Sequence, residues 1–367
     1  MIIKRFKDFT VNVLAGANVV TVILMLFIGF SDHINPISHP YIGSIGLIFP
    51  LFLILNLGLL FFWLIVKWRM SLIPIIGFVV GYIPIRTYIP INPSSNPPTD
   101  AIKVLSYNVH CYSGMHGDDD KQKTFREIFN YFKESKADIV CLQEDLYPGN
   151  VSEAFIDSLF AYKHIAMVGT KKQNAVGVYT HYPIIHVDTI AYPSEGNGSI
   201  ACFLKIKQDT VIVINNHFES THLSPDERQH YKEMLKGEMN RNSAKTESRR
   251  LFHRLSESVK LRAPQADIVH HYIEEHNKYP IILCGDFNDS PISYTHRIVN
   301  KALIDCYVET GQGIGLSYNQ KGFFVRIDNI MCSNYFQPYN CKVDNKIETS
   351  DHYPIICWLK KLDNPKK

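Results

Sequence analysis

Residues 279–289 read YPIILCGDFND, an apolar run that ends in a cluster of polar residues. The run at 279–284 is short and apolar and has turn-forming residues on both sides, which is typical of a buried strand. Asp286 and Asn288 follow it two residues apart, so on an extended segment their side chains face the same side. Gly285 lets another part of the backbone come close to the strand end. The stretch therefore predicts a strand whose end presents a carboxylate and an amide to a functional site.

The same pattern of an apolar run followed by polar residues recurs along the rest of the chain. Further strands are expected at 102–109, 138–142, 175–180, 184–190, 200–206, 210–216, 326–332 and 354–359. Helices are expected at 121–135 and across most of 225–277, with a break near Ala263 and Pro264. The polar residues at or beside the strand ends are Asn108, Glu144, His217, Asp286, Asn288, Asp328 and His352. Because a sheet-based fold gathers distant residues at its strand ends, these residues are candidates for one site.

Six short motifs in this region carry a family resemblance. They are SYNVH (106–110), LQED (142–145), NNHF (215–218), GDFND (285–289), RIDNI (326–330) and SDHYP (350–354). In this order they resemble the endonuclease/exonuclease/phosphatase superfamily, which includes DNase I-like nucleases, inositol polyphosphate phosphatases and neutral sphingomyelinases. The resemblance implies that residues 102–367 are a catalytic domain with an α/β fold, a four-layered sandwich of two mixed β-sheets flanked by helices. It also implies hydrolysis of a phosphoester with a divalent metal ion.

The motifs contain oxygen ligands that suit such an ion. Mg²⁺ prefers one or two carboxylates, other oxygen ligands and several waters. Glu144 is the candidate carboxylate ligand, Asn108 offers an amide oxygen and, as in family members, Asp351 adds a second carboxylate. Mn²⁺ is the alternative ion. His110 stands where some nucleases of the family carry a second acidic ligand, so the choice between one and two metal ions stays open.

The resemblance also implies catalytic roles. Family residues that match Asp286 and Asn288 orient or deprotonate the attacking water and hold a phosphate oxygen. The family histidine that matches His217 contacts the phosphate. Asp328 and His352 match a carboxylate–histidine pair, in which the carboxylate fixes the tautomer and favours the protonated ring. Either Asp286 or His352 is the general base, and the sequence leaves this choice open.

The first third of the chain predicts a helical membrane anchor at 1–91, joined to the catalytic domain by a linker at 92–101 that is rich in Pro, Ser and Asn. A bilayer core of roughly 30 Å takes about 20 apolar helical residues. Residues 11–30 and 42–66 meet this length. Residues 71–91 are a poorer third helix, since prolines and an arginine interrupt them. A signal peptide is the alternative for the first segment, but further apolar segments follow it.

Basic residues predict the orientation of the anchor. Lys4, Arg5 and Lys7 precede the first apolar segment, and Lys67 and Arg69 follow the second. The positive-inside rule places both groups in the cytoplasm. With three spans, the protein is an integral, multi-pass membrane protein whose catalytic domain lies on the non-cytoplasmic side. If the third segment only lies in the interface, the catalytic domain is cytoplasmic instead.

The net charge of the chain argues against nucleic acid as the favoured substrate. A net charge of +3 and a pI near 8.3 give no reason to expect a nonspecific nucleic-acid binder. A lipid or small-molecule phosphodiester or phosphomonoester is therefore the favoured substrate. Residues 227–262 hold ten Lys or Arg against five Glu, which keeps a membrane-anchored DNase I-like nuclease as the alternative. A non-catalytic, membrane-tethered binding protein on the same fold is disfavoured, because the expected metal and catalytic residues are all present.

The cysteines argue against a zinc ribbon. All eight follow residue 110 and no CxxC pair occurs. Several lie within apolar runs, so most are expected to be free core thiols. A disulfide between Cys332 and Cys341 is the alternative for these two residues. The sequence does not address the oligomeric state.

Overall fold

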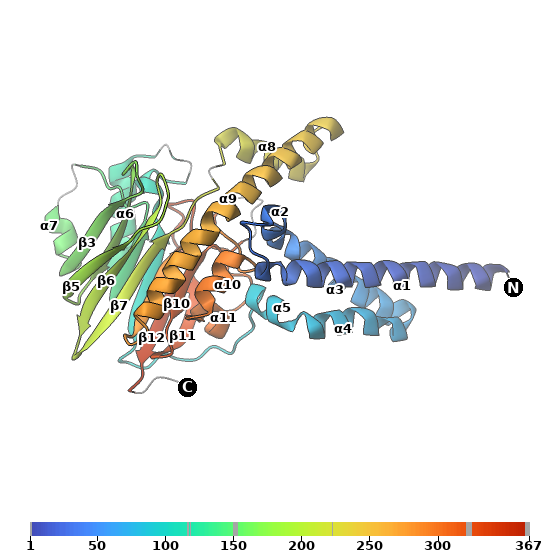
Figure 1. Ribbon diagram of the computed structural model, residues 1–367, viewed down its shortest axis with the longest axis horizontal. Helices are drawn as coiled ribbons and strands as arrows, with labels where there is room; N and C mark the ends of the chain where they lie inside the picture. The colour runs from blue at the N-terminus through green and yellow to red at the C-terminus, as the bar shows by residue number, and fades with distance from the viewer. Residues whose placement is uncertain are drawn as a thin grey trace.

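Two β-sheets packed face to face form the body of the protein in the computed structural model (Figure 1). The structure describes residues 2–115, 117, 119–149, 153–221, 223–320 and 325–363. The first sheet has the order β11 (Phe336–Val343), β12 (Ile355–Lys361), β1 (Ile102–Asn108), β2 (Ile139–Gln143), β4 (Asn174–Thr180) and β3 (Tyr162–Val168). The second has the order β5 (Ile184–Ile190), β6 (Gly198–Ile206), β7 (Asp209–His217), β8 (Ile281–Asp286), β10 (Asp328–Cys332) and β9 (Ile304–Asp305). One pair in each sheet, β1–β2 and β7–β8, is parallel and the others are antiparallel, so both sheets are mixed.

Helices cover the outer face of each sheet. The first sheet carries α6 (Lys121–Ser135) and α7 (Glu153–Asp157), and the second carries α9 (Arg241–Glu275) and α10 (Tyr294–Asn300). Phe125 and Ile128 of α6 belong to one buried cluster with Leu105 of β1, because residues three and four apart share one face of a helix. Between the sheets, Val104 of β1 belongs to the same buried cluster as Val213 of β7. This order of helix, sheet, sheet and helix confirms the predicted four-layered sandwich.

The helical stretch after residue 224 divides at Gly237, and the predicted break near Pro264 is wrong. The helix α8 (Pro225–Lys236) ends at Gly237, whose φ is +71°. The side chain of Asn240 caps the start of α9 by accepting from the Ser243 N–H. Pro264 lies inside α9, where it removes one backbone hydrogen bond while Ala263 beside it is fully buried. A left-handed glycine ends a helix readily, whereas packing on the sheet outweighs the lost bond at the proline.

Three of the strands differ from the sequence patterns, whereas the cysteines agree with them. Strands β3, β9 and β11 were not predicted, because β3 and β11 mix exposed and buried residues without regular alternation and β9 has only two residues. All eight cysteines are free, and all but Cys111 are buried, which confirms the expected core thiols. Cys332 is not bonded to Cys341; its sulfur lies 3.6 Å from that of Cys306.

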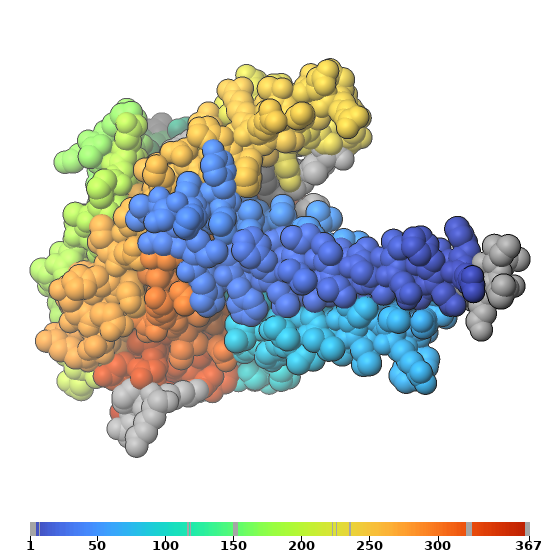
Figure 2. All heavy atoms as spheres, turned by 45° about the vertical axis from the view of Figure 1, so that its right-hand side comes forward, coloured from blue at the N-terminus to red at the C-terminus, as the bar shows by residue number. Residues whose placement is uncertain are grey.

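The helices of residues 2–88 project from the sandwich (Figures 1 and 2). The first, α1 (Ile2–Gly29), runs towards the sandwich; α3 (Phe49–Val66) runs away from it; α4 (Leu72–Val80) and α5 (Tyr82–Tyr88) return to it. Two helical segments, Asp8–His33 and Pro40–Val66, are long and apolar enough to cross a membrane. The predicted single third helix is instead a pair of helices bent by 69°. The bend falls at Gly81, just before Pro84, whose missing N–H interrupts helical hydrogen bonding.

A buried polar cluster joins α1 to α3. Asn18 donates to Asn56 Oδ1 at 3.1 Å, and Trp63 Nε1 donates to Asn18 Oδ1 at 2.9 Å. Thr21 also donates to Asn56 Oδ1, at 3.0 Å. Interhelical hydrogen bonds of this kind hold apolar helices in a fixed register. Most other side chains of α1 and α3 are apolar, and many of them are exposed.

The returning end of α5 is tied to the sandwich by a buried arginine. Arg326 donates to the Thr87 carbonyl at 3.0 Å and to the Ile314 carbonyl at 3.1 Å. Its guanidinium also lies 3.6 Å from Asp305 and 4.3 Å from the centre of the Tyr307 ring. Arg326 comes two residues before Asp328 in the chain, so one buried charge connects the N-terminal helices to the start of β10.

Arg326→Met is expected to destabilise the protein by about 3–5 kcal/mol, because removal of one partner of a buried ion pair leaves the other uncompensated. The two carbonyls would also lose their donor. Thermal unfolding of the full chain in detergent measures the change. Arg297→Met is the matched control, since Arg297 is 30% exposed and its nearest carboxylate lies 4.0 Å away. Equal melting temperatures for the two variants would contradict a structural role for Arg326.

Candidate active site

The sheet register brings the polar strand ends together. In the second sheet, Asp286 at the end of β8 is the register partner of His217 on β7 and of Asp328 on β10. In the first sheet, the parallel pair β1–β2 ends at Asn108 and just before Glu144. Carboxyl ends of parallel strands lie at the same edge of a sheet. These strand ends of the two sheets face each other. Polar residues from six separate parts of the chain meet between them.

Asp286 is the centre of the cluster. Its Oδ2 accepts from Asn108 Nδ2 at 3.0 Å and lies 3.7 Å from His352 Nε2 and 3.8 Å from His217 Nε2. Its Oδ1 accepts from the backbone N–H of Asn288 at 2.8 Å. Burial raises the pKa of Asp286 to about 7, with the His352 charge opposing the shift. The carboxylate thus contacts residues from both sheets.

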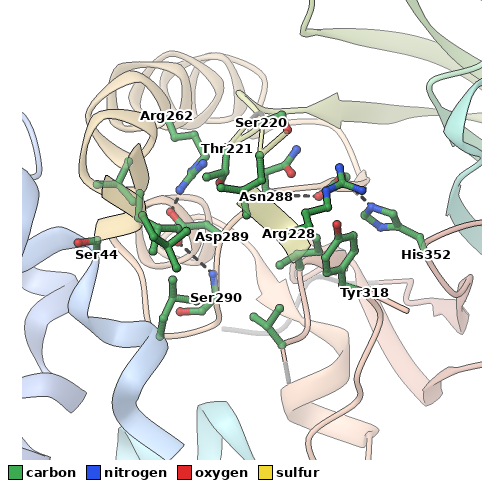
Figure 3. Close-up of a pocket in the computed structure, with 18 of the residues that line it drawn as sticks. Ser44, Ser220, Thr221, Arg228, Arg262, Asn288, Asp289, Ser290, Tyr318 and His352 are labelled. Atoms are coloured by element: carbon green, nitrogen blue, oxygen red, sulfur yellow. Dashed lines mark hydrogen bonds and ion pairs between the residues drawn. The ribbon is translucent and has the colours of Figure 1, made fainter. Parts of the chain in front are cut away.

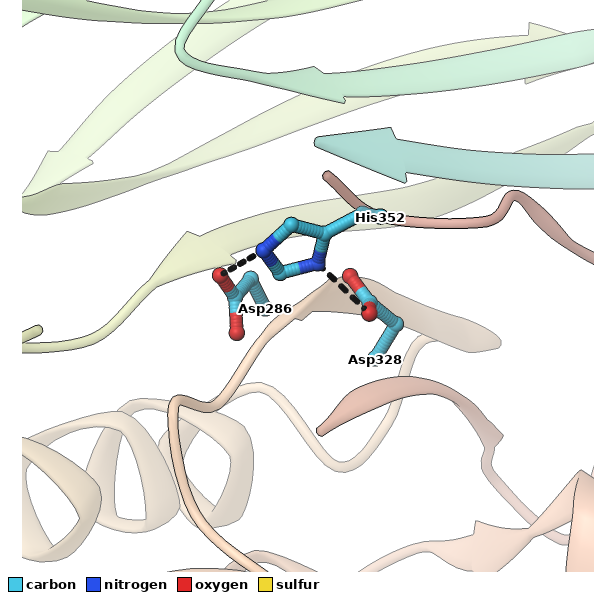
Figure 4. A group of neighbouring side chains, drawn as sticks. All are labelled: Asp286, Asp328 and His352. Atoms are coloured by element: carbon cyan, nitrogen blue, oxygen red, sulfur yellow. Dashed lines mark hydrogen bonds and ion pairs between the residues drawn. The ribbon is translucent and has the colours of Figure 1, made fainter. Parts of the chain in front are cut away.

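Asp328 and His352 form the predicted pair (Figure 4). His352 Nδ1 lies 2.9 Å from Asp328 Oδ2, and its Nε2 points to Asp286. Burial by itself lowers the pKa of His352, but the carboxylates of Asp328 and Asp286 outweigh it and raise the pKa to about 10. The ring of Tyr318 meets the His352 ring edge-on, with 5.2 Å between the ring centres. The imidazole is therefore held between two carboxylates in its protonated form.

His217 has a different electrostatic environment. Its Nδ1 lies 3.4 Å from Asn174 Nδ2, and its Nε2 lies 3.8 Å from both Glu144 Oε1 and Asp286 Oδ2. The Nε2 atom is buried and makes no hydrogen bond within the described residues. Burial lowers the pKa of His217, so the ring is expected to be neutral near pH 7. An amide that donates to Nδ1 leaves the ring proton on Nε2, which faces the carboxylates.

Glu144, Asn108 and Asp286 offer oxygen ligands for a divalent ion. Asn108 Nδ2 lies 3.3 Å from Glu144 Oε1 and 3.0 Å from Asp286 Oδ2, so one polar atom bridges two carboxylates. Burial raises the pKa of Glu144, but nearby histidines, His217 first, outweigh it and lower the pKa below its usual value. Asn108 Oδ1 accepts from the His110 N–H at 3.1 Å, so the amide must rotate before its oxygen can face an ion. Two carboxyl groups and an amide oxygen fit Mg²⁺ or Mn²⁺.

A second group of possible ligands overlaps this one. Atoms of Asp286, Asp328 and His352 lie within 4.8 Å of one another. Both ring nitrogens of His352 already face carboxylates, however, since Nδ1 lies 2.9 Å from Asp328 Oδ2 and Nε2 lies 3.7 Å from Asp286 Oδ2. We therefore expect a metal ion on the Glu144 and Asn108 side of Asp286.

Asp351 and Asn288 lie at the border of the cluster. Asp351 Oδ1 lies 3.7 Å from His110 Nδ1, and Oδ2 lies 3.8 Å from Arg228 Nη1. The contacts among the described residues do not join Asp351 to Glu144 or Asn108. Asn288 has a φ of +51° and donates from Nδ2 to the Phe218 carbonyl at 3.0 Å, so its side chain is held beside Asp286.

Three further site residues escaped the sequence patterns: Asn174, Arg228 and Tyr318. Asn174 begins β4, and Tyr318 precedes a segment that the structure does not describe. Arg228 belongs to α8, in the basic stretch at 227–262, and its side chain is two-thirds buried. Figure 3 places it beside Tyr318 and His352. None of the three follows a strand motif, so no local signal separates them from surface residues.

A cavity of about 900 Å³ contains the cluster. Glu144, His217, Asp286 and His352 line it together with residues of α8 and α9 and with residues 43–50 of the N-terminal region. In Figure 3, Ser44 and His352 lie on opposite sides of this cavity. A volume of this size holds a molecule considerably larger than a phosphate group.

Comparisons with known proteins agree with this architecture. A family model described as "Endonuclease/Exonuclease/phosphatase family" matches residues 105–352, and a model described as a domain of unknown function matches residues 11–88. No curated protein matches the chain.

Solved structures share the fold at low sequence identity. The human Nocturnin catalytic domain with bound sulfate is 12% identical, with a TM-score of 0.52 over 73% of this chain and 97% of that one. An endonuclease/exonuclease/phosphatase family protein from Bacteroides thetaiotaomicron is 18% identical, with a TM-score of 0.50 over 72% and 98%. A functionally unknown conserved protein from Enterococcus faecalis V583 is 15% identical, with a TM-score of 0.50 over 71% and 100%. At these identities the likeness establishes the fold alone.

Proposed function

The chain belongs to the endonuclease/exonuclease/phosphatase family, and from this we propose that it is a membrane-anchored hydrolase of phosphoesters that depends on a divalent metal ion. The observation that carries the proposal is the position of Asp286, which lies between the imidazoles of His217 and His352 and beside the amide of Asn108. One carboxylate thus adjoins two possible hydrogen-bond donors to a phosphoryl group and the expected metal ligands. This is the set of groups that phosphoester hydrolysis requires.

The geometry favours Asp286 as the base. His352 Nδ1 lies 2.9 Å from Asp328 and Nε2 faces Asp286 at 3.7 Å, and the two carboxylates raise the pKa of His352 to about 10, so the protonated ring has no lone pair for a proton. In the proposed reaction, water attacks phosphorus and its proton passes to Asp286. The bond from phosphorus to the leaving oxygen breaks, and solvent water donates a proton to that oxygen. Asp286 then releases its own proton to solvent, which restores the carboxylate. His352 and His217 offset the charge on the phosphoryl oxygens, and Asn288 holds one of them.

Glu144 and Asn108 are the residues that we expect to hold the metal ion, with Asp286 beside them and Asp351 as a predicted further ligand. A bound Mg²⁺ or Mn²⁺ supplies positive charge for the phosphoryl oxygens and lowers the pKa of a coordinated water. The protein side chains orient the water and the phosphoryl group.

The N-terminal helices support the anchor at 1–91, with three crossings if α4 and α5 together make one. The basic start of α1 and the 67–69 turn lie at the end of the bundle farthest from the sandwich (Figure 1). The positive-inside rule assigns that end to the cytoplasm, so we propose that the catalytic domain, 102–367, faces the other side.

This orientation predicts the reactivity of two engineered cysteines. Glu275→Cys lies on the exposed end of α9, and Arg69→Cys lies in the distant turn. A membrane-impermeant maleimide added to intact cells should label Glu275→Cys and leave Arg69→Cys unlabelled until the cells are lysed. The native thiols are a low background because all but Cys111 are buried. If only Arg69→Cys is labelled in intact cells, the proposed orientation is wrong and the catalytic domain faces the cytoplasm.

The proposed activity is tested with the full chain in detergent micelles. Bis-p-nitrophenyl phosphate, p-nitrophenyl phosphate and plasmid DNA are each incubated with Mg²⁺ or Mn²⁺, with and without EDTA. We expect turnover of a p-nitrophenyl ester that requires the metal. A folded protein that hydrolyses none of these esters would contradict the proposal and favour a non-catalytic binding role, and cleavage of DNA alone would identify a nuclease.

A further inference from the structure

Part of the lining of the catalytic cavity is apolar, and we call this part the apolar arm. We use this name for the part lined by Leu47, Ile48, Leu223, Leu251, Leu255 and Val259. None of these six side chains can bind a phosphate or a metal ion. The arm therefore has no use in the chemistry at Asp286 and is available to another part of the substrate.

Two walls from distant parts of the chain enclose the arm. One wall is α9 together with Leu223, just before α8, and the other is the segment 43–50, which lies within the membrane-span candidate Pro40–Val66. Tyr41 of α2 (Pro40–Gly43) stacks on Phe252 of α9, with 5.6 Å between the ring centres. Figure 2 shows the outer ends of α8 and α9 on one side and the N-terminal helices on the other.

Tight packing holds the segment 43–50 against the sandwich. A β-carbon on Gly46 would lie 1.9 Å from the Ile292 carbonyl oxygen, so only glycine permits this approach. Ile292 itself packs with Phe49, Met25, Ile28 and Tyr88 from the N-terminal helices. The segment 43–50 is therefore held at a fixed distance from α9, and this distance determines the width of the arm.

The open side of the arm adjoins the region expected to meet the membrane. Ile37, Tyr41 and Ile48 are about half exposed, and Phe252 is 39% exposed. Exposed apolar side chains gathered at one place mark a surface that meets another apolar phase. Here they stand beside the start of a span candidate, so the adjacent phase is the bilayer.

Charges in the cavity match one phosphoryl group better than a polyanion. Arg262 lines the cavity, but its Nε lies 3.2 Å from Asp289 Oδ2, and both side chains are buried. Among the residues that the structure describes, Arg228 is the other arginine that lines the cavity, and its nearest carboxylate, Asp351, lies 3.8 Å away. A nucleic-acid groove instead offers a series of basic side chains along the backbone.

We propose that the apolar arm holds the hydrocarbon chain of a membrane lipid, so that the substrate is a lipid phosphoester that enters from the bilayer between the segment 43–50 and α9. This inference rests on the proposed phosphoester hydrolysis at Asp286. Water adds across the bond between phosphorus and the leaving oxygen. A diester yields a phosphomonoester and an alcohol, and a monoester yields inorganic phosphate and an alcohol. The hydrocarbon chain takes no part in the bond changes and serves to bind and position the lipid.

The test compares two p-nitrophenyl phosphodiesters that differ only in their second group, ethyl or decyl. The full chain is assayed in mixed micelles with Mg²⁺. Each buried methylene can improve kcat/KM by roughly fourfold. We expect the decyl ester to exceed the ethyl ester by at least about 100-fold, mainly through KM. Equal values would overturn the lipid proposal and leave the proposed hydrolysis intact, whereas no turnover of either ester would refute the hydrolysis itself.

Wall variants separate the cavity from simple partition of the ester into micelles. Leu255→Trp and Leu47→Trp fill the arm from opposite walls, and each should lower the decyl-to-ethyl ratio of kcat/KM by at least about tenfold. Leu261→Trp makes the same change on α9, at a side chain that is 52% exposed and does not line the cavity, and should keep the wild-type ratio. Thermal unfolding verifies that each variant folds. A wild-type ratio in every folded wall variant would overturn the proposal.

Discussion

Replacing Asp286 with Asn is expected to lower kcat by about 10²- to 10⁴-fold, the range that a positioned general base contributes. The asparagine keeps nearly the same shape and can still accept the N–H of Asn288, which is 2.8 Å from Oδ1 in the native protein. It removes the negative charge and the basic oxygen between His217 and His352. Because water would lose its proton acceptor, the loss should fall mainly on kcat, with a smaller change in KM.

Steady-state kinetics on bis-p-nitrophenyl phosphate with saturating Mg²⁺ measures this effect. Asp157→Asn is the control with the same chemical change, since Asp157 is 60% exposed on α7 and its ion pair with Lys163 lies at the surface. Exposed ion pairs contribute little to stability, so this variant should behave as the wild type. An Asp286→Asn protein with normal kcat and a normal melting temperature would exclude Asp286 as the base.

Replacing Glu144 with Gln is expected to weaken metal binding by at least about 100-fold, because loss of even an indirect metal contact costs up to about that factor. Glutamine can still accept the hydrogen bond from Asn108 Nδ2, so the local structure should persist. The charge that attracts the cation is lost. Metal-dependent turnover should fall to near the level seen in EDTA.

Titration of the full chain with Mn²⁺, followed by electron paramagnetic resonance, measures binding without reference to activity. Glu153→Gln on α7 is the matched control, as its side chain is 69% exposed and lies 3.6 Å from Lys163. The assignment of Glu144 as a ligand fails if both variants bind Mn²⁺ as tightly as the wild type does. In that case the group formed by Asp286, Asp328 and His352 becomes the next candidate.

Local patterns were sufficient to predict most of the fold. The apolar run at 279–284 became β8, and its polar continuation supplied Asp286 and Asn288. Helix α6 followed its apolar spacing, and the two strongest apolar segments at the start of the chain are the two span candidates. These features depend on residues close together in the sequence, where side-chain periodicity determines which face is buried.

The errors occurred where packing competes with local preference. Pro264 was expected to end a helix, but burial of that part of α9 on the second sheet outweighs one lost hydrogen bond. The third apolar segment read as one helix, whereas Gly81 and Pro84 allow the 69° bend that returns α5 to Arg326. Strand β3 lacks an alternating pattern and depends on its pairing with β4.

The sequence by itself determined the family, the strand-end positions of the candidate residues and the presence of apolar helices. Only the tertiary structure decided that His352 lies between Asp328 and Asp286, that Arg228 reaches the site from α8, and that the segment 43–50 forms a wall of the catalytic cavity. The physical reason is distance along the chain. A sequence motif shows which side chains lie at a strand end. The register of the sheets and the packing of distant helices determine which of these side chains contact one another.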